Sequence, residues 1–262
     1  MNVYIMVDME GISGITVRDH VVKGSALYAE GRRYMTADIN VCVRAAKEAG
    51  AEKVYVRDAH SDGMNVIYSE LCPEADGYIM GYTEQDRFPF LDECDAVILL
   101  GYHAMAGTHM GILEHSMSSA TIQNYHINGV LAGETAIDAA IVGERGKPVI
   151  MVSGDDKLCA EAKALLPWVV TAEVKKGLSW HGAMLLPQAK AHALLREKTI
   201  EAVKNAANAK PLVYEKPITM RVELIERGTL PKAYAKPYMK ILDGRTYEVT
   251  GDSMEEVLFR AH

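Results

Sequence analysis

Basic residues are scarce and scattered in this sequence. Its 28 Lys and Arg are outnumbered by 35 Asp and Glu, which gives a formal net charge of -7. Nucleic acids are bound by concentrated positive charge that neutralises phosphates, so we exclude them as partners and expect small molecules instead. Long apolar segments are also missing. No stretch reaches the roughly 20 residues that a membrane-spanning helix needs, so we expect no membrane partner.

Cysteine is rare, and none of the four forms a C-x-x-C pair. Cys42, Cys72, Cys94 and Cys159 therefore predict reduced thiols in a cytoplasmic protein. The N-terminal apolar run has no basic flank and stops at Asp8, which is too short for a signal peptide. Both observations favour a cytoplasmic location.

Short apolar runs, in contrast, recur along the chain and predict buried strands. Residues 2–7 form a nearly unbroken run with β-branched and aromatic members, which is typical of a parallel strand covered on both faces. A helical pattern in 34–49 ends at Gly50 and leads directly into the next run, giving a βαβ unit. We therefore predict an α/β fold around a mostly parallel βαβ sheet, with further strands at 53–57, 96–100 and 148–154 and further helices from Glu134 and at 155–166.

Two carboxylates follow the first predicted strand. Because side chains alternate along an extended chain, Asp8 and Glu10 point the same way. Such a pair of negative charges is unfavourable unless a cation lies between them, and a divalent metal fits best. Taken alone, the two residues are equally compatible with loop acids, in which Asp8 caps a turn before Gly11.

Other strands also end in residues that bind metals. His60 follows the strand at 53–57, and His103 follows the strand at 96–100. In open α/β sheets the carboxyl ends of the strands form the ligand-binding crevice, so these side chains are expected to meet there. Glu134, at the start of a predicted helix, is a further candidate, although a helix-start carboxylate also complements the helix dipole.

Three carboxylates and two histidines exceed the ligand set of one catalytic zinc, which usually takes three protein ligands and a water. Five ligands suit two metals that share a carboxylate, and Asp8, first to leave the strand, is the expected bridge. A metal pair activates a bridging water for hydrolysis. Asp58, two residues before His60, is expected to accept the ring N–H of that histidine and fix its tautomer.

The remaining chain predicts a second region. Residues 1–160 would form the α/β metal-binding catalytic region, and 161–262 a closely packed C-terminal α+β lobe without a flexible linker between them; one continuous domain is the alternative. Asp155 and Asp156 are interpreted as helix-capping residues and left out of the metal set. The glycine-containing stretch 11–33 predicts loops over the site, as a lid or an oligomer contact. The lobe is expected to contain strands at 168–174, 218–225 and 247–250, a helix at 187–209 and a final helix from Asp252.

Five segments carry a family resemblance: VDMEGISG from Val7, RDAHSDGMN from Arg57, LGYHAMAG from Leu100, EHSM from Glu114 and GETAIDAAI from Gly133. In order and spacing they resemble the D-aminopeptidase DppA family of zinc peptidases, from residue 1 to about 160 and more weakly beyond. The resemblance implies a zinc hydrolase with two Zn²⁺ per chain that removes N-terminal D-amino acids from short peptides. It also implies a homo-oligomer built from rings, such as a decamer.

Carried over position by position, the resemblance implies that the metal ligands are Asp8, Glu10, His60, His103 and Glu134, and it alone singles out His115 as the catalytic histidine. In the expected mechanism a metal-bridging hydroxide attacks the peptide carbonyl. His115 then stabilises the oxyanion or protonates the leaving amine. Glu114 or Asp62 would recognise the substrate ammonium group, and preference for D residues rests on the resemblance alone.

Two other functions stay open. The same ligands would serve a dinuclear amidohydrolase or phosphoesterase of other specificity, for which Arg57 and Arg18 are the candidate phosphate-binding residues. Alternatively, the chain is a non-catalytic, metal-dependent peptide-binding protein whose metals are fully saturated by protein ligands. Exchangeable water at the metals and chelator-sensitive turnover would distinguish the enzymes from the binding protein.

Overall fold

The computed structural model describes residues 1–84, 86–234 and 236–261. It has an α/β fold whose centre is a seven-stranded sheet in the order β3-β2-β1-β4-β7-β8-β9, and every pairing in it is parallel except β8 with β9. The expected fold class is therefore confirmed. The strands are β1 (Asn2–Val7), β2 (Lys53–Asp58), β3 (Gly77–Ile79), β4 (Ala96–Leu100), β7 (Val149–Asp155), β8 (Val170–Ser179) and β9 (Gly182–Leu185).

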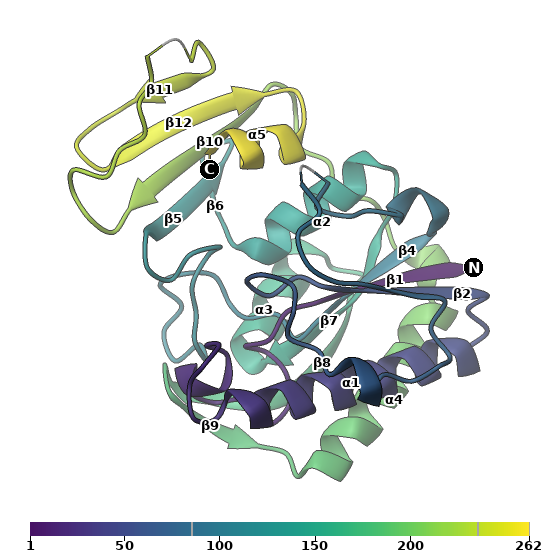
Figure 1. The fold of residues 1–262 in the computed structure, drawn as a ribbon. Coiled ribbons are helices and arrows are strands. Elements are labelled where there is room, and N and C mark those ends of the chain that lie inside the picture. The colour runs from purple at the N-terminus through teal and green to yellow at the C-terminus, as the bar shows by residue number, and fades with distance from the viewer. Residues whose placement is uncertain (85, 235, 262) are drawn as a thin grey trace.

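A second, five-stranded sheet lies to one side of the first, at the upper left of Figure 1. It is antiparallel, in the order β11-β12-β10-β5-β6. The sheets do not divide the chain at residue 160, because two strands before that point join the small sheet and two strands after it join the large one. The strands of the small sheet are β5 (Ile122–Ile127), β6 (Val130–Ala132), β10 (Ile218–Leu224), β11 (Met239–Ile241) and β12 (Thr246–Gly251).

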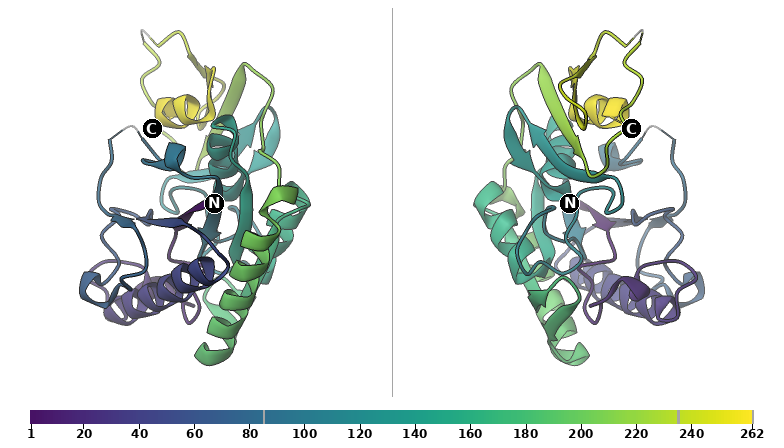
Figure 2. Two further views of the ribbon diagram at one scale, coloured as in Figure 1. Left: turned by 90° about the vertical axis from the view of Figure 1, so that its right-hand side faces the viewer. Right: turned by 90° about the vertical axis from the view of Figure 1, so that its left-hand side faces the viewer.

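Helices cover both faces of the large sheet. Helices α1 (Tyr28–Glu48) and α4 (Gln188–Lys204) pack on one face, below the sheet in Figure 1, and bury the side chains of Val3, Ile5 and Val7. Figure 2 shows the small sheet and α5 (Met254–Ala261) at the opposite end of the molecule from α1 and α4. Helices α2 (Glu134–Glu144) and α3 (Asp156–Leu165) pack on the other face of the large sheet. Among the described residues, no helix is both long and apolar enough to cross a membrane.

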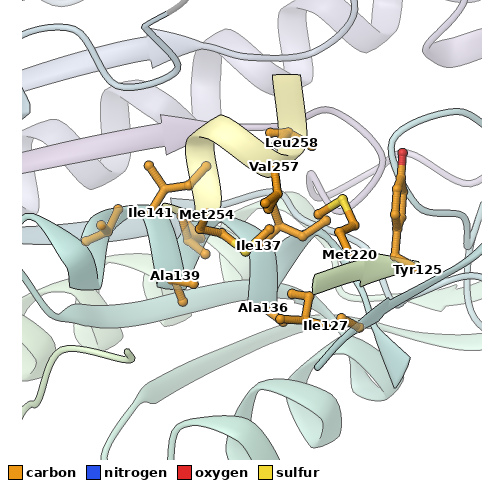
Figure 3. Packing of buried hydrophobic residues seen from close by; sticks show 14 of the residues in the cluster. Tyr125, Ile127, Ala136, Ile137, Ala139, Ile141, Met220, Met254, Val257 and Leu258 are labelled. Atoms are coloured by element: carbon orange, nitrogen blue, oxygen red, sulfur yellow. The ribbon is translucent and has the colours of Figure 1, made fainter. Parts of the chain in front are cut away.

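One apolar core joins the two sheets. Figure 3 shows Ile137 of α2, Met220 of β10 and Val257 of α5 packed together in it. The same cluster contains Tyr4 and Met6 of β1, in the centre of the large sheet. Helix α2 is therefore fixed from both sides, and the position of its first residue, Glu134, depends on both sheets.

Helix α1 differs from its expected length, since it begins six residues earlier than the pattern at 34–49 predicted. Gly31 indicated a loop, but it lies inside the helix where α1 crosses η1 (Arg18–His20). A Cβ atom at Gly31 would lie 2.1 Å from the carbonyl oxygen of His20, so the close crossing requires glycine there. Helix α4 ends at Lys204 and not near residue 209, and the short 3-10 helix η4 (Ala206–Asn208) follows it.

The acidic pair at the end of β7 lies at the start of α3, where Asp155 caps the helix and Asp156 is in its first turn. Asp155 is the N-cap of α3, and its Oδ1 accepts hydrogen bonds from the backbone N–H groups of Lys157 (3.1 Å) and Leu158 (2.8 Å). Its Oδ2 accepts a further bond from the backbone of Ile112 at 2.8 Å. All of these partners are structural, so Asp155 is not available to a metal.

Candidate metal centre and active site

The strand order brings the predicted ligands to one point. β1 pairs with β2 on one side and with β4 on the other, so the direction in which successive strands are added to the sheet reverses at β1. At such a point a crevice opens at the carboxyl ends of the strands. Two glycines let the chain turn at this point. The N–H of Gly11 donates to the carbonyl of Gly101 at 2.7 Å, and a Cβ at Gly11 would lie only 1.8 Å from the Tyr102 carbonyl oxygen. Gly101 itself has a φ of +73°.

The five predicted metal ligands meet in this crevice. His60 Nδ1 lies 3.1 Å from Asp8 Oδ1 and 3.2 Å from Glu10 Oε2. His103 Nε2 lies 3.3 Å from Asp8 Oδ2 and 3.2 Å from Glu134 Oε1. Asp8 thus stands between the two histidines and turns one oxygen toward each, which is the arrangement expected of a carboxylate shared by two metals.

Backbone carbonyls fix the histidine rings. The Nε2 of His60 lies 3.0 Å from the carbonyl of Val21, and the Nδ1 of His103 lies 3.0 Å from that of Ala104. A carbonyl accepts only from an N–H, so the proton of each neutral ring is on the nitrogen that faces it. The other nitrogen of each ring then points its lone pair toward the carboxylates, as in histidines that ligate metals.

Charge and burial at this point favour a cation. Burial and the neighbouring Glu10 raise the pKa of Asp8 to about 6. The burial of His103 would lower its pKa, but Glu134 and Asp8 outweigh that effect and hold it well above its usual value. Within the part of the chain that the structure describes, Asp8 Oδ2, Glu10 Oε2 and His103 Nε2 are buried without a hydrogen-bond partner. Buried polar atoms need partners, and a divalent metal fits this nitrogen and oxygen set.

His115 joins the cluster from a different segment. Its ring stacks on that of His103 with centroids 4.0 Å apart, and its Nε2 lies 3.7 Å from Glu134 Oε1. Its Nδ1 faces the carbonyl of Leu113 at 2.8 Å, which leaves Nε2 free to act. Two groups have ligand atoms close enough to hold an ion: His103 with His115 and Glu134, and Asp8 with Glu10 and His103.

Asp58 does not have the contact that the sequence predicted, because no ring nitrogen of His60 bonds to it among the contacts described. Its carboxylate accepts hydrogen bonds from the backbone N–H groups of Asn65 (2.5 Å) and Val66 (3.1 Å). The side-chain amide of Asn65 also donates to Asp58 at 2.9 Å and to the carbonyl of His60 at 2.7 Å. Asp58 therefore holds the loop that carries His60, while Val21 holds the ring.

A cavity of about 520 Å³ opens onto the cluster. Its walls include Asp8, Glu10, His60, His115 and Glu134 together with residues of the segment 18–23, so part of the expected loop region does lie over the site. Two candidates for ammonium recognition do not line this cavity. Glu114 instead accepts a hydrogen bond from the backbone of Gly107 at 2.5 Å, and Asp62 pairs with Lys23 at 3.0 Å.

The sequence analysis missed two buried groups that support the site. Arg87 lines the cavity and forms a two-pronged ion pair with Asp138, which also accepts a hydrogen bond from Tyr102 at 2.6 Å. Asp138 lies one helical turn after Glu134, so both acids are on one face of α2. This spacing was the signal in the sequence that Asp138 lies near the site.

Lys175 is the second missed group, and it is fully buried. Its Nζ donates to the backbone carbonyls of Glu10 (2.6 Å), Ile12 (2.9 Å) and Ile15 (2.7 Å). These three bonds hold the turn that carries Asp8 and Glu10. The sequence carried no clear signal for this role, because Lys175 lies beside Lys176 and two residues after Glu173 in a strand of mixed polarity.

Comparison with known proteins agrees with this geometry. A family model described as D-aminopeptidase matches residues 1–261. The chain belongs to the D-aminopeptidase family. The family resemblance noted in the sequence is thereby confirmed, and it extends beyond residue 160 to nearly the whole chain.

Two relatives of this family member are informative. The D-aminopeptidase of Bacillus subtilis (strain 168) is 36% identical over 249 residues, which is 94% of this chain and 89% of the relative. A solved structure, described as the Zn-dependent D-aminopeptidase DppA from Bacillus subtilis, a self-compartmentalizing protease, is similar with a TM-score of 0.92 at 34% identity. That match covers 100% of this chain and 95% of the other.

Proposed function

We propose that this chain is a zinc-dependent aminopeptidase that removes N-terminal D-amino acids from short peptides. The observation that carries the proposal is the convergence of three carboxylates and three histidines beside an open cavity, which all of them except the buried His103 line. Family membership and the names of both Bacillus relatives support the same activity. Among the functions considered, none of these findings favours the phosphoesterase or the binding protein.

Two zinc ions per chain fit the donor atoms best. Glu10 and His60 would hold one ion, Glu134 and His103 the other, and Asp8 would contribute an oxygen to each. Bound zinc supplies a Lewis acid that polarises the peptide carbonyl and a water acidified for attack. The two groups of described residues with metal-binding geometry share His103, so they support a metal at this cluster, while the count of two rests on the donor atoms around Asp8.

His115 would move the proton in this reaction. With its Nδ1 proton engaged by Leu113, the lone pair on Nε2 faces the cavity and can take up a proton. The protonated ring can then donate to the leaving amine or to the developing oxyanion. Its stacking on His103 fixes the ring plane, so the proton is held at a defined place beside the metals.

The proposal includes a homo-oligomer of rings, such as a decamer, in the cytoplasm. The description of the Bacillus structure as self-compartmentalizing supports the oligomer. The four cysteines are free and buried, which favours a reducing compartment.

The first experiment measures amine release from D-Ala-D-Ala and from L-Ala-L-Ala by the zinc-loaded protein, with a chelator-treated control. We expect chelator-sensitive cleavage of the D form alone. Cleavage of both forms, or of the L form only, would leave a metallopeptidase and remove the stereochemical part of the proposal. Absence of any cleavage would refute the proposed activity.

His115→Ala separates catalysis from metal binding. If the residue acts on the proton, the variant loses turnover by about 100-fold or more while its zinc content, measured by atomic absorption, stays at the wild-type level. A matched variant, His181→Ala, changes a histidine outside the cavity wall and should keep both. Loss of zinc from His115→Ala would instead make this histidine a ligand.

A further inference from the structure

A second cavity, of about 430 Å³, adjoins the catalytic one. The two share four lining residues, namely Ala59, Ser61, Arg87 and Met117. Leu258 and Phe259 of α5 contribute an apolar wall on the far side. The shared residues place the second cavity directly beside the first, and none of the predicted metal ligands lines it.

Arg57 lines this second cavity, and no ion pair joins it to the part of the chain that the structure describes. It is the penultimate residue of β2, opposite Met6 of β1, and is partly buried. Among the described residues, no acceptor bonds to its Nε or Nη1, although both atoms are enclosed. A guanidinium group stays charged in proteins, so this position holds a positive charge without a hydrogen-bonded anion.

The acidic side chains nearby are already engaged. Asp138 is paired with Arg87, and Asp86 accepts from Arg145 at 3.1 Å and from the backbone of Phe88 at 2.9 Å. Both carboxylates act on the charge of Arg57 from a distance without bonding to it.

The acids that line the second cavity are not free partners either. Asp58 is bonded to Asn65, and Asp62 is bonded to Lys23, while Glu84 is exposed. Among the residues that the structure describes, no acidic side chain is therefore bonded to the guanidinium, and a ligand in the cavity could supply the anion.

The missing partner has a definite chemistry. A buried charge is unfavourable unless it is paired, and Nη2, the guanidinium nitrogen that is not among the enclosed atoms, can donate a charge-assisted hydrogen bond to a carboxylate in the cavity. A short peptide whose N-terminal bond lies at the metal ligands could place its next residue in the adjoining cavity, because the two cavities share four lining residues. That residue, in a dipeptide, carries the free carboxylate.

We propose that the second cavity is the subsite for the leaving part of the peptide, and that Arg57 binds its C-terminal carboxylate. This inference rests on the proposed aminopeptidase function. It also explains why the enzyme would prefer short peptides, since only these place a C-terminal carboxylate near Arg57. The apolar wall of Leu258 and Phe259 would contact the side chain of the leaving residue. An amide at the C-terminus would lose the ionic bond and fit poorly.

The turnover test compares D-Ala-D-Ala with its C-terminal amide in the zinc-loaded enzyme. We expect Arg57→Met to raise KM for the free acid by about 10- to 100-fold, because a charge-assisted hydrogen bond is lost. KM for the amide should change little. Arg196→Met, an exposed arginine of α4 paired with Glu48, is the matched control and should behave as wild type. Equal use of acid and amide by the wild type, or equal effects of Arg57→Met on both, would overturn the subsite.

A binding test separates this inference from the proposed function. Titration calorimetry of the zinc-loaded protein with N-acetyl-D-alanine, which has a carboxylate and no free amine, should give binding that Arg57→Met abolishes and Arg196→Met keeps. Binding that depends on Arg57 without turnover of any peptide would refute the aminopeptidase but keep the carboxylate site. Binding unaffected by Arg57→Met, in a variant with an unchanged thermal midpoint, would refute the carboxylate site.

Discussion

Removing one partner of the ion pair between Arg87 and Asp138 should be among the most destabilising single substitutions near the site. The side chain of Asp138 is fully buried and that of Arg87 is 19% exposed. Asp138→Ala would leave the arginine charge without its carboxylate and the hydroxyl of Tyr102 without its acceptor. Breaking a buried pair in this way typically reduces stability by about 3–5 kcal/mol, and the partial exposure of Arg87 favours the lower end.

The assay is urea denaturation at fixed protomer concentration, because oligomerisation makes apparent stability depend on concentration. We expect Asp138→Ala to lose about 3 kcal/mol, or about 10 °C in thermal midpoint. The double variant Arg87→Met/Asp138→Ala removes both charges and should recover at least about 1 kcal/mol of that loss. A loss below about 1 kcal/mol for Asp138→Ala, or strict additivity in the double variant, would refute the reasoning.

Three further predictions concern the metals and pH. Lys175→Met removes the donor to three backbone carbonyls and should weaken zinc binding by about 10- to 100-fold in a chelator competition, with unchanged affinity refuting its positioning role. Burial raises the pKa of Glu161 to about 7, from its ordinary 4.5. Between these two pH values the folded state keeps the proton that the unfolded state has already lost, so the stability of the fold decreases as the pH rises through this range. Glu161→Gln should therefore gain up to about 3 kcal/mol at pH 8 and little at pH 4, and an equal gain at both would contradict this. Removing zinc by dialysis against a chelator should lower the thermal midpoint, and added zinc should restore it. The corresponding loss in the free energy of unfolding is up to about 4 kcal/mol per site, relative to free zinc 1,000-fold above Kd.

The centre of the fold could be predicted because its signals are local. The run from Asn2 to Val7 and the run from Ala96 to Leu100 are apolar at nearly every position, and both form strands with those bounds. Once those strands are parallel neighbours, the residues after them must meet at one edge of the sheet. The convergence of Asp8, Glu10 and His103 therefore followed from strand ends alone.

The small sheet could not be predicted in the same way, because its signals are not local. β5 contains Gln123, Asn124 and His126, whose polarity hides its alternating burial. Its pairing with β10 joins residues about 90 positions apart, a contact that no short pattern encodes. The ion pair of Arg87 with Asp138 and the bonds of Lys175 are long-range contacts of the same kind, which is why they were missed.

The pairing of β5 with β10 also sets an order of events during synthesis of the protein. At ordinary translation rates the ribosome needs roughly 5 to 20 s to make the residues between Ile127 and its partner Met220. Until then the edge of β5 that β10 later covers stays open, and α2, which follows the β5–β6 hairpin, lacks the packing of α5 and β10. Glu134 opens that helix, so a growing chain acquires its metal-binding geometry only when its last quarter has left the ribosome. Zinc capture would thus mark the end of folding and not its beginning.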